Sequence, residues 1–565
     1  MIRLVSILSF FLAAFLPLGA KTVLDSSAVP PRLLSDGRGF LILGGELGNS
    51  AATSCSDIRH NLQKVASMNL NTVLVPAYWD LIEPEEGNFD FSLTDCAIDA
   101  ASDNGLGVVF LWFGAWKNSM SCYAPSWVKR DVARFPRART KVGNPLEILS
   151  AFSPDVLEAD SKAFTDWLHH VEDYDRNGVV RMVQIENEIG MLEDARDFSE
   201  LAEKAYASGV PEELTAFLAR NAGSLHPELK RRWDDNGNLR SGSWREVFGD
   251  DIFSDEYFMA WNYARYVEHL AGEGRKISGV PFYLNAALNS RGRLPGEYPS
   301  AGPLAHLKDI WHAGAPSVDF LSPDIYDSGF EGWTAGYALP DNILFIPEVR
   351  RDDSNAAQAF YVFGHHRALG FSPFSIENGD EHYVATLAPA YGILGQLSPL
   401  LTSLNADIFM DGVLLSKENP STVVYDGDTR ITLSHFFTLP WDSRTTDGSP
   451  WRDAGAIIFK LAPDEYILAG TGVVAKFEDI SEQNDSVVRG EDGFAERGGG
   501  SDGEQRTLSS ASRVGLDLVE EVCFSPDGAM EKVRTFNGDE THQGRHARIS
   551  VDDNKILHIK IYRYN

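Results

Sequence analysis

The stretch Arg181-Met-Val-Gln-Ile-Glu-Asn-Glu-Ile-Gly190 joins a run of branched apolar residues to a dense group of polar ones. Its first half predicts a short buried β-strand. Its second half ends that strand with two carboxylates and an amide, in Glu186, Asn187 and Glu188. Charged groups are costly to bury without partners, so this ending predicts a polar site arranged around the end of the strand.

Seven further apolar runs of strand length lie between residues 38 and 377, most of them separated by segments long enough for a crossover helix. Together with the first they give eight predicted strands, at 40–45, 72–76, 108–113, 179–186, 282–286, 320–325, 343–347 and 371–376. Strands that alternate with helices in this way predict an α/β fold, and eight of them predict a closed parallel (β/α)8 TIM barrel.

Polar or aromatic side chains stand at or just past the carboxyl ends of the predicted strands. In a parallel barrel this end is the functional face. Any one strand end can meet a polar loop for no functional reason, but eight in phase favour a common site. The residues are Glu46, Tyr78, Trp112, Glu188, Asn285, Asp324, Glu348 and Glu377.

After about residue 395 the pattern changes to short alternating segments separated by Gly, Asp and Pro, which predicts an all-β, sandwich-like region. We therefore expect a signal peptide at 1–20, a catalytic barrel at 21–395 and a C-terminal β domain at 396–565. The connection after the fourth strand is unusually long. It predicts a helical insertion near 191–279 that caps the barrel mouth, or alternatively makes an oligomer contact.

The chain carries a formal net charge of −31 and has a pI near 4.8. This charge argues against nucleic acid and anionic membranes as partners, and it suits a neutral ligand. The basic start, the apolar run at 4–18 and the small residues Gly19-Ala20 predict a secretory signal cleaved near Ala20. We expect a secreted or periplasmic protein with no membrane contact after cleavage. The alternative is that the amino-terminal segment stays uncleaved as a membrane anchor. No later stretch is expected to reach the length of a membrane span.

The chain has four cysteines, and their spacing is not that of a zinc site. We therefore predict no metal, and we expect no other cofactor. An oxidising compartment allows a disulfide among the first three, with its pairing left open. The cysteines are Cys55, Cys96, Cys122 and Cys523.

Cleavage of a glycosidic bond needs two carboxyl groups at the barrel mouth. Glu188 is the predicted general acid, with a pKa raised by a negative neighbour and by partial burial. Glu348, which ends the apolar run Ile343-Leu-Phe-Ile-Pro-Glu348, is the predicted nucleophile, and Glu377 is its rival. Strands four and seven end on the same rim, so the two groups can meet. A separation of about 5–5.5 Å would retain the anomeric configuration.

The remaining candidates at this rim are predicted to bind substrate. Asn187 would donate to the sugar hydroxyl next to the anomeric carbon, and Tyr326 would orient Glu348. Aromatic faces stack on sugar rings, although core packing is the alternative for each of them. Glu186 is expected on the same side as Glu188, with structural support favoured over sugar contact. The full set is Glu46, Tyr78, Trp112, Trp116, Lys117, Asn118, Asn187, Asn285, Tyr326 and Glu377.

Several of these motifs resemble those of glycoside hydrolase family 35, the β-galactosidases. Gln184-Ile-Glu-Asn-Glu-Ile-Gly190 is similar to the acid/base signature of the family. Asn71-Thr-Val-Leu-Val-Pro-Ala-Tyr-Trp-Asp-Leu-Ile-Glu-Pro84, followed by Glu86-Gly-Asn-Phe-Asp-Phe91, is similar to its second-strand motif. The resemblance covers most of residues 38–380. It implies a retaining, exo-acting barrel enzyme without a metal, with Glu188 as acid/base and Glu348 as nucleophile.

Three motifs depart from the family pattern. The first strand reads Gly44-Gly-Glu-Leu-Gly-Asn-Ser50, where better-known members carry a His-Tyr pair. The motif after the third strand reads Trp112-Phe-Gly-Ala-Trp-Lys-Asn118, without the usual sugar-binding Glu, and Ile189 replaces an aromatic residue. The sequence thus resembles the bacterial-type branch, in which a C-terminal β domain of unassigned function often follows the barrel.

The favoured hypothesis is a secreted retaining exo-β-galactosidase that acts on terminal β-galactosyl residues of oligo- or polysaccharides. The alternatives are a barrel glycosidase with another glycone and a carbohydrate-binding barrel without catalysis. A missing carboxylate would favour the last, but both carboxylates are present. The aglycone, the linkage and the oligomeric state are open at this stage.

Overall fold

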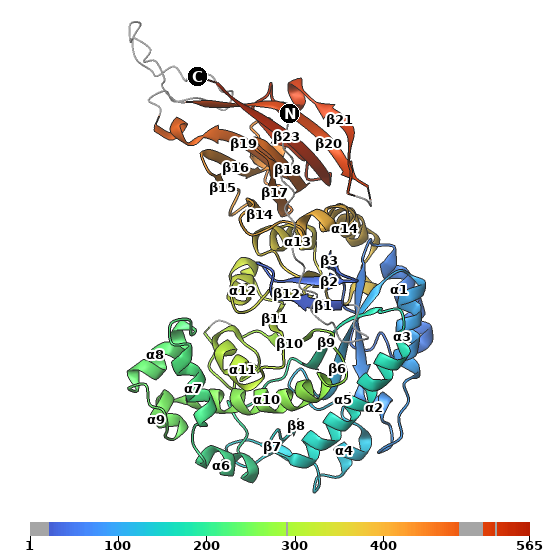
Figure 1. Cartoon of the computed structure of the whole chain (residues 1–565), viewed down its shortest axis with the longest axis vertical. Coiled ribbons are helices and arrows are strands. Elements are labelled where there is room, and N and C mark those ends of the chain that lie inside the picture. The colour runs from blue at the N-terminus through green and yellow to red at the C-terminus, as the bar shows by residue number, and fades with distance from the viewer. Residues whose placement is uncertain (1–21, 290–291, 485–511, 526–527, 565) are drawn as a thin grey trace, which may run out of the picture.

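The computed structural model describes residues 22–289, 292–484, 512–525 and 528–564. The predicted signal peptide at 1–20 lies outside these residues. Within them, eight parallel strands form a barrel with helices in a ring around it, and an all-β domain follows (Figure 1). The predicted barrel with a C-terminal all-β region is confirmed.

The barrel strands follow the order β4-β13-β12-β11-β10-β9-β6-β5. Hydrogen bonds around Glu46 close the barrel, because the Leu74 N–H donates to the Gly45 carbonyl and the Leu47 N–H donates to the Leu74 carbonyl. Most strand residues are buried, as expected for strands covered on both faces. The strands are β4 (Ile42–Leu43), β5 (Thr72–Tyr78), β6 (Gly107–Lys117), β9 (Val180–Asn187), β10 (Phe282–Ala287), β11 (Phe320–Ile325), β12 (Phe345–Val349) and β13 (Gly370–Pro373).

Eight helices connect or follow these strands on the outside of the barrel. Their starts carry ordinary caps: Ser153, for example, accepts the Val156 N–H and precedes a proline at the first turn. The helices are α1 (Cys55–Ala66), α3 (Ser92–Asp103), α5 (Pro154–Tyr174), α10 (Ile252–Gly274), α11 (Lys308–Gly314), α12 (Phe330–Tyr337), α13 (Asn355–His365) and α14 (Glu381–Leu401). The boundary predicted at residue 395 falls inside α14. Shorter elements in the connections are α2 (Trp79–Ile82), α4 (Ser126–Arg130), β7 (Arg137–Arg139) and β8 (Pro145–Leu149).

The long connection after β9 contains α6 (Glu200–Ala207), α7 (Glu212–Arg220), α8 (Pro227–Asp235) and α9 (Trp244–Phe248) before the crossover helix α10. Of these, α7 packs on α11 and α9 packs on α10. The group lies at the periphery of the helical ring (Figure 1). The insertion is thus helical as predicted, but it sits against the outer helices rather than over the barrel mouth.

Among the described residues, one helix, α14, is long and apolar enough to cross a membrane by length and composition. No such stretch was expected from the sequence. This helix contains Pro389 and Pro399. It contacts α13, β3 (Arg38–Phe40), β4 and two strands of the C-terminal domain, β18 (Glu465–Thr471) and β20 (Arg513–Phe524). Its apolar composition matches its position between two packed layers.

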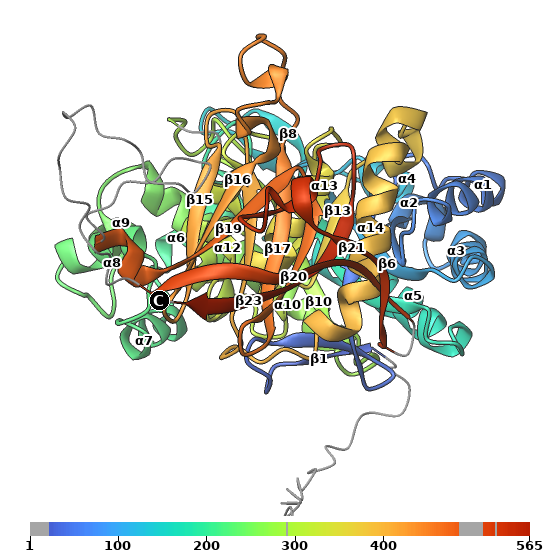
Figure 2. The same ribbon diagram turned by 90° about the horizontal axis from the view of Figure 1, so that it is seen from above.

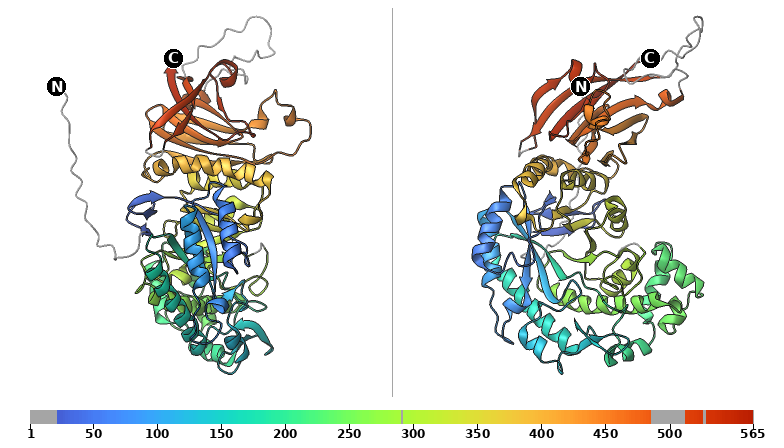
Figure 3. Two further views of the ribbon diagram at one scale, coloured as in Figure 1. Left: turned by 90° about the vertical axis from the view of Figure 1, so that its right-hand side faces the viewer. Right: turned by 180° about the vertical axis from the view of Figure 1, so that it is seen from behind.

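The C-terminal domain consists of two antiparallel sheets around a shared core. It rests on α13 and α14 (Figure 2, Figure 3). A Cβ at Gly412 would lie 2.4 Å from the Tyr361 carbonyl oxygen, so only glycine lets β14 approach α13 this closely. One sheet contains β14 (Met410–Leu415), β17 (Ala454–Ala462), β18 (Glu465–Thr471), β20 (Arg513–Phe524), β21 (Met530–Phe536) and β23 (Lys555–Tyr564). The other contains β15 (Ser421–Asp426), β16 (Thr429–His435), β19 (Val473–Asp479) and β22 (Ala547–Arg548).

Two smaller features complete the fold. A small sheet of β1 (Thr22–Asp25), β2 (Arg32–Ser35) and β3 (Arg38–Phe40) precedes the barrel. A disulfide joins Cys55 of α1 to Cys96 of α3, whose Cα atoms are 5.8 Å apart, and Cys122 and Cys523 are free thiols. The disulfide predicted among the first three cysteines is confirmed.

Candidate active site

Glu188 lies directly after β9 with its side chain buried at the barrel mouth. Its backbone N–H donates to Oδ1 of Asn285 at 2.9 Å, and Nδ2 of Asn118 donates to its carboxyl group. Glu186 and Glu188 both have positive φ angles, of 59° and 47°. Such angles break the regular pleat of a strand, so the two glutamates do not point the same way.

Glu348 lies in β12, and its Cα pairs with that of Asp324 in β11. The hydroxyl of Tyr326, just past β11, donates to Oε1 of Glu348. Nδ2 of Asn285 donates to Oδ2 of Asp324 at 2.6 Å. Asn285 therefore links the backbone of Glu188 to the side chain of Asp324, and so joins the two halves of the site.

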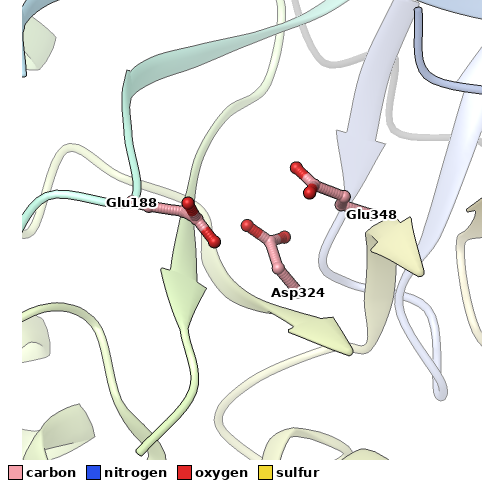
Figure 4. Close-up of side chains that lie close together, drawn as sticks. All are labelled: Glu188, Asp324 and Glu348. Carbon is pink, nitrogen blue, oxygen red and sulfur yellow. The ribbon is translucent and has the colours of Figure 1, made fainter. Parts of the chain in front are cut away.

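The carboxyl groups of Glu188, Asp324 and Glu348 converge, with one oxygen of each within 4.8 Å of the others (Figure 4). Glu188 and Glu348 are 160 positions apart in the chain but meet here because parallel strands end on one rim. Asp324 stood among the strand-end residues of the sequence but not among the predicted binding residues. The local signals for it were its place at a strand end and its position two residues before Tyr326.

Burial and charge set the ionisation of these groups. Burial first, and then the negative charge of Glu348, raise the pKa of Glu188 to about 7. Burial followed by the same charge also raises the pKa of Asp324 and of Glu46 well above their usual ranges. The Lys117 ammonium opposes the rise in all three groups. The site thus holds a glutamic acid that is protonated in mildly acidic solution beside a second glutamate.

Three carboxyl oxygens at this separation could also surround a divalent cation. The Lys117 ammonium, buried beside the same groups, already supplies compensating positive charge from the protein itself. This arrangement favours an acid/base site over a cation site. The expectation of no metal stays a prediction.

Two further predicted residues contribute polar atoms that have no hydrogen-bond partner among the described residues. These atoms are the two carboxyl oxygens of Glu46 and the amide oxygen and nitrogen of Asn187. All four are buried. Buried polar groups without protein partners are costly, so these atoms are available to a hydroxyl-rich ligand. Lys117, Asn118, Asn285 and Tyr326 also lie in the site, through the contacts above.

Glu377 and Tyr78 lie at the edge of the site with partners of their own. Glu377 accepts the Gly48 N–H at 3.2 Å and a hydrogen bond from Asn378 at 2.6 Å. The Tyr78 hydroxyl accepts the Ala52 N–H, and its ring packs against Phe113. Glu377 does not belong to the group of three carboxylates, which weighs against it as the rival nucleophile.

The structure contradicts the prediction that Trp112 and Trp116 bind substrate. Both are fully buried between β6 and the outer helices. Nε1 of Trp112 donates to Asp160 of α5 at 3.0 Å, and Nε1 of Trp116 donates to the Leu149 carbonyl at 3.3 Å. These contacts place both indoles on the outer face of the strand. β6 itself continues to Lys117, beyond the predicted end at 113. Only Lys117 and Asn118 reach the mouth.

Glu186 also faces the helical layer, not the side of Glu188 as predicted. Its carboxyl oxygens accept the N–H groups of Ala115 at 3.2 Å and of Trp116 at 2.7 Å. The favoured interpretation as structural support agrees with these contacts. The prediction assumed the regular alternation of side chains along a strand. It was wrong because Glu186 and Glu188 themselves have positive φ angles, which interrupt this alternation.

Two family models match the sequence. Residues 52–247 match the model of glycoside hydrolase family 42, described as beta-galactosidase, and residues 387–548 match a domain of unknown function. The predicted resemblance to β-galactosidases is therefore confirmed, but family 42 rather than family 35 is indicated. Short strand-end motifs reflect the barrel and its chemistry, which related families share, and so do not separate them.

Similar proteins include a beta-galactosidase of Xanthomonas manihotis, 27% identical over 168 residues, which cover 29% of this chain and 26% of that protein. Beta-galactosidase-1-like protein 3 of Rattus norvegicus is 28% identical over 179 residues, 30% of this chain and 26% of that protein. The chain thus matches about a quarter of the length of these relatives. The solved beta-galactosidase of the psychrophilic Marinomonas ef1 has a TM-score of 0.46 and 14% identity, with 64% of this chain and 62% of that chain covered.

Proposed function

We propose that this protein is a retaining exo-β-glycosidase that removes terminal β-galactosyl residues from oligo- or polysaccharides. One observation carries the proposal: the carboxyl groups of Glu188 and Glu348 approach within 4.8 Å at the barrel mouth. Retaining enzymes place their two carboxyl groups about 5–5.5 Å apart, whereas inverting enzymes need about 6.5–9.5 Å to admit a water. With carboxyl oxygens within 4.8 Å of each other, Glu188 and Glu348 fit the closer, retaining spacing.

In the first step, a carboxylate oxygen of Glu348 attacks the anomeric carbon as the bond to the leaving oxygen breaks. Glu188 gives its proton to that oxygen. The hydroxyl of Tyr326 donates a hydrogen bond to Oε1 of Glu348 and so orients this carboxyl group as a nucleophile. The raised pKa of Glu188 suits an acid that must still hold its proton near neutral pH.

In the second step, water attacks the same carbon and gives a proton to Glu188, while the ester bond to Glu348 breaks. The sugar leaves with its original configuration, and both carboxyl groups return to their starting states. Asn187, whose amide atoms have no hydrogen-bond partner among the described residues, is placed to hydrogen-bond the hydroxyl beside the anomeric carbon.

Galactose as the glycone rests on the similarity of residues 52–247 to β-galactosidases. Hydrolysis of a panel of aryl β-glycosides, including galactoside, glucoside, arabinoside and fucoside, tests it. We expect the highest kcat/KM with the galactoside. A different preferred glycone would keep the mechanism and replace the substrate. Cleavage of none of them by the folded protein would instead favour a carbohydrate-binding barrel.

Proton NMR of the first product tests the mechanism separately from the glycone. We expect the β-anomer to appear first and the α-anomer only later, by mutarotation. Initial release of the α-anomer would make the enzyme inverting and overturn the role of Glu348.

We also infer that the protein is secreted, because its first 20 residues have the composition of a signal peptide. Expression of the full chain with its own amino terminus should place the mature protein outside the cytoplasm, with an amino terminus near Lys21. Retention in the cytoplasm at full length would contradict this.

A further inference from the structure

The end of β6 leaves its regular pairing with β9 just before the active site. Trp112 pairs with Ile185, and the next pair is Lys117 with Asn187. Four residues of β6, 113–116, therefore stand opposite a single residue of β9, Glu186. Such a bulge leaves backbone N–H groups without strand partners, and buried N–H groups need an acceptor.

The side chain of Glu186 provides that acceptor. Its two carboxyl oxygens accept the N–H groups of Ala115 and Trp116, both within the bulge. The residue opposite the bulge thus holds the bulge in place. Glu186 is fully buried, so water does not compete for these hydrogen bonds.

A second buried carboxyl group, Asp160 of α5, lies against the first. Nε1 of Trp112 donates to its Oδ1 at 3.0 Å, and the hydroxyl of Tyr266 donates to its Oδ2 at 2.8 Å. An ideal Cβ on Gly114 would lie 2.7 Å from Oδ1 of Asp160 and 2.8 Å from Oε1 of Glu186. Both oxygens therefore lie beside the backbone of Gly114, where the Cβ atom of any other residue would collide with them.

Two carboxyl groups that flank one backbone position in a dry site repel each other when both are ionised, which favours one shared proton. Burial, and then the charge of Asp160, raise the pKa of Glu186 well above its usual range. The other ionisable groups near the pair are Tyr263 and Tyr266 of α10, and Asp197 faces Tyr263. Within the described part of the chain, none of the hydrogen bonds to either carboxyl group comes from a lysine or arginine.

The bulge leads directly into the residues that contact Glu188. Asn118 donates through its backbone N–H to the Asn187 carbonyl at 3.1 Å and through its side chain to Glu188. The Lys117 ammonium lowers the pKa of Glu188. A displacement of the bulge would therefore move a charge and a hydrogen-bond donor away from the general acid.

We propose that Asp160 and Glu186 form a proton-sharing pair that holds the β6 bulge, and through it keeps Lys117 and Asn118 against Glu188. The inference rests on the proposed function. Neither residue touches the substrate; both are positioning residues, and their effect reaches the chemistry through the bulge.

The test replaces Glu186 in the full-length protein and follows kcat/KM against pH. Glu186→Met removes both acceptors and should lower kcat/KM for a glycoside with a poor leaving group by roughly 10- to 100-fold. Because Lys117 lowers the pKa of Glu188, displacement of Lys117 should move the alkaline limb of the profile of kcat/KM against pH to higher pH. A glycoside with an activated leaving group, which needs little proton donation, should lose much less.

Two further variants keep the test decisive. Glu186→Gln supplies an acceptor oxygen and replaces the shared proton with an amide N–H, so it should keep the parent's alkaline limb and most of its activity. Glu186→Asp keeps a carboxyl group but shortens the side chain, so that the group no longer reaches the bulge. This variant should move the alkaline limb to higher pH, and it provides the test even if Glu186→Met does not fold.

Val171→Ala, in the buried face of the same helix as Asp160, is the matched control for lost stability. It should lower the melting temperature and leave the limb unmoved. If folded Glu186→Met and Glu186→Asp keep the parent's limb and kcat/KM, the pair is merely structural and the inference fails. If the parent cleaves no glycoside at all, the proposed function itself has failed.

Discussion

Replacement of Glu188 by glutamine removes the proton that the proposed mechanism gives to the leaving group. The pKa of Glu188 lies at about 7, against an ordinary value of 4.5. This difference corresponds to about 3 kcal/mol of disfavoured ionisation. Burial is the larger cause and the charge of Glu348 the second. The carboxyl group of Glu348 approaches that of Glu188 within 4.8 Å, and the Lys117 ammonium offsets part of the rise in pKa.

The assay is kcat/KM from pH 4 to pH 9 with two aryl β-galactosides, one with a poor and one with an activated leaving group. In the parent, kcat/KM should fall as the pH rises through about 7, because Glu188 loses its proton there. Glu188→Gln should lower kcat/KM for the poor leaving group by roughly 10²–10⁴-fold. For the activated leaving group the loss should be much smaller, and the alkaline limb should disappear.

The ratio kcat/KM is the suitable quantity because it reports the first step only, whereas kcat would include the slowed attack of water. Persistence of the limb near pH 7 in the Glu188→Gln variant would assign that ionisation to another group. Equal losses with both leaving groups would refute a role in proton donation and indicate damage to the fold or to binding.

Glu348→Gly should lower kcat by roughly three orders of magnitude or more, and sodium azide should restore turnover with an α-glycosyl azide as product; a β-glycosyl azide would contradict its role. Lys117→Met should raise the pKa of Glu188, so the alkaline limb should move above pH 7, and a downward shift would refute the assigned charge interaction. Trp112→Phe leaves Asp160 without its indole donor and should lower the free energy of unfolding by about 1–3 kcal/mol while KM stays unchanged; a raised KM would return Trp112 to the substrate site. Dialysis against EDTA should leave activity unchanged, and a loss that a divalent cation restores would make the three carboxylates a metal site.

The sequence by itself determined the barrel, the all-β region after it and the two facing glutamates. These predictions depend on local patterns: runs of buried apolar residues with helical segments between them, each ending in a polar side chain. In a parallel barrel the carboxyl ends of all strands share one rim, so Glu188 and Glu348 could be brought together without knowledge of any contact between them.

Only the tertiary structure decided which way the side chains near the strand ends point. The outward direction of Trp116 and Glu186 depends on the bulge of β6 against β9, and this pairing joins segments about 70 residues apart. Likewise, Asp324 enters the site because β11 pairs with β12 in a register that sets it beside Glu348. A one-residue change in register reverses every side chain of a strand. Register is fixed by partners distant in the chain, and so a local pattern does not contain it.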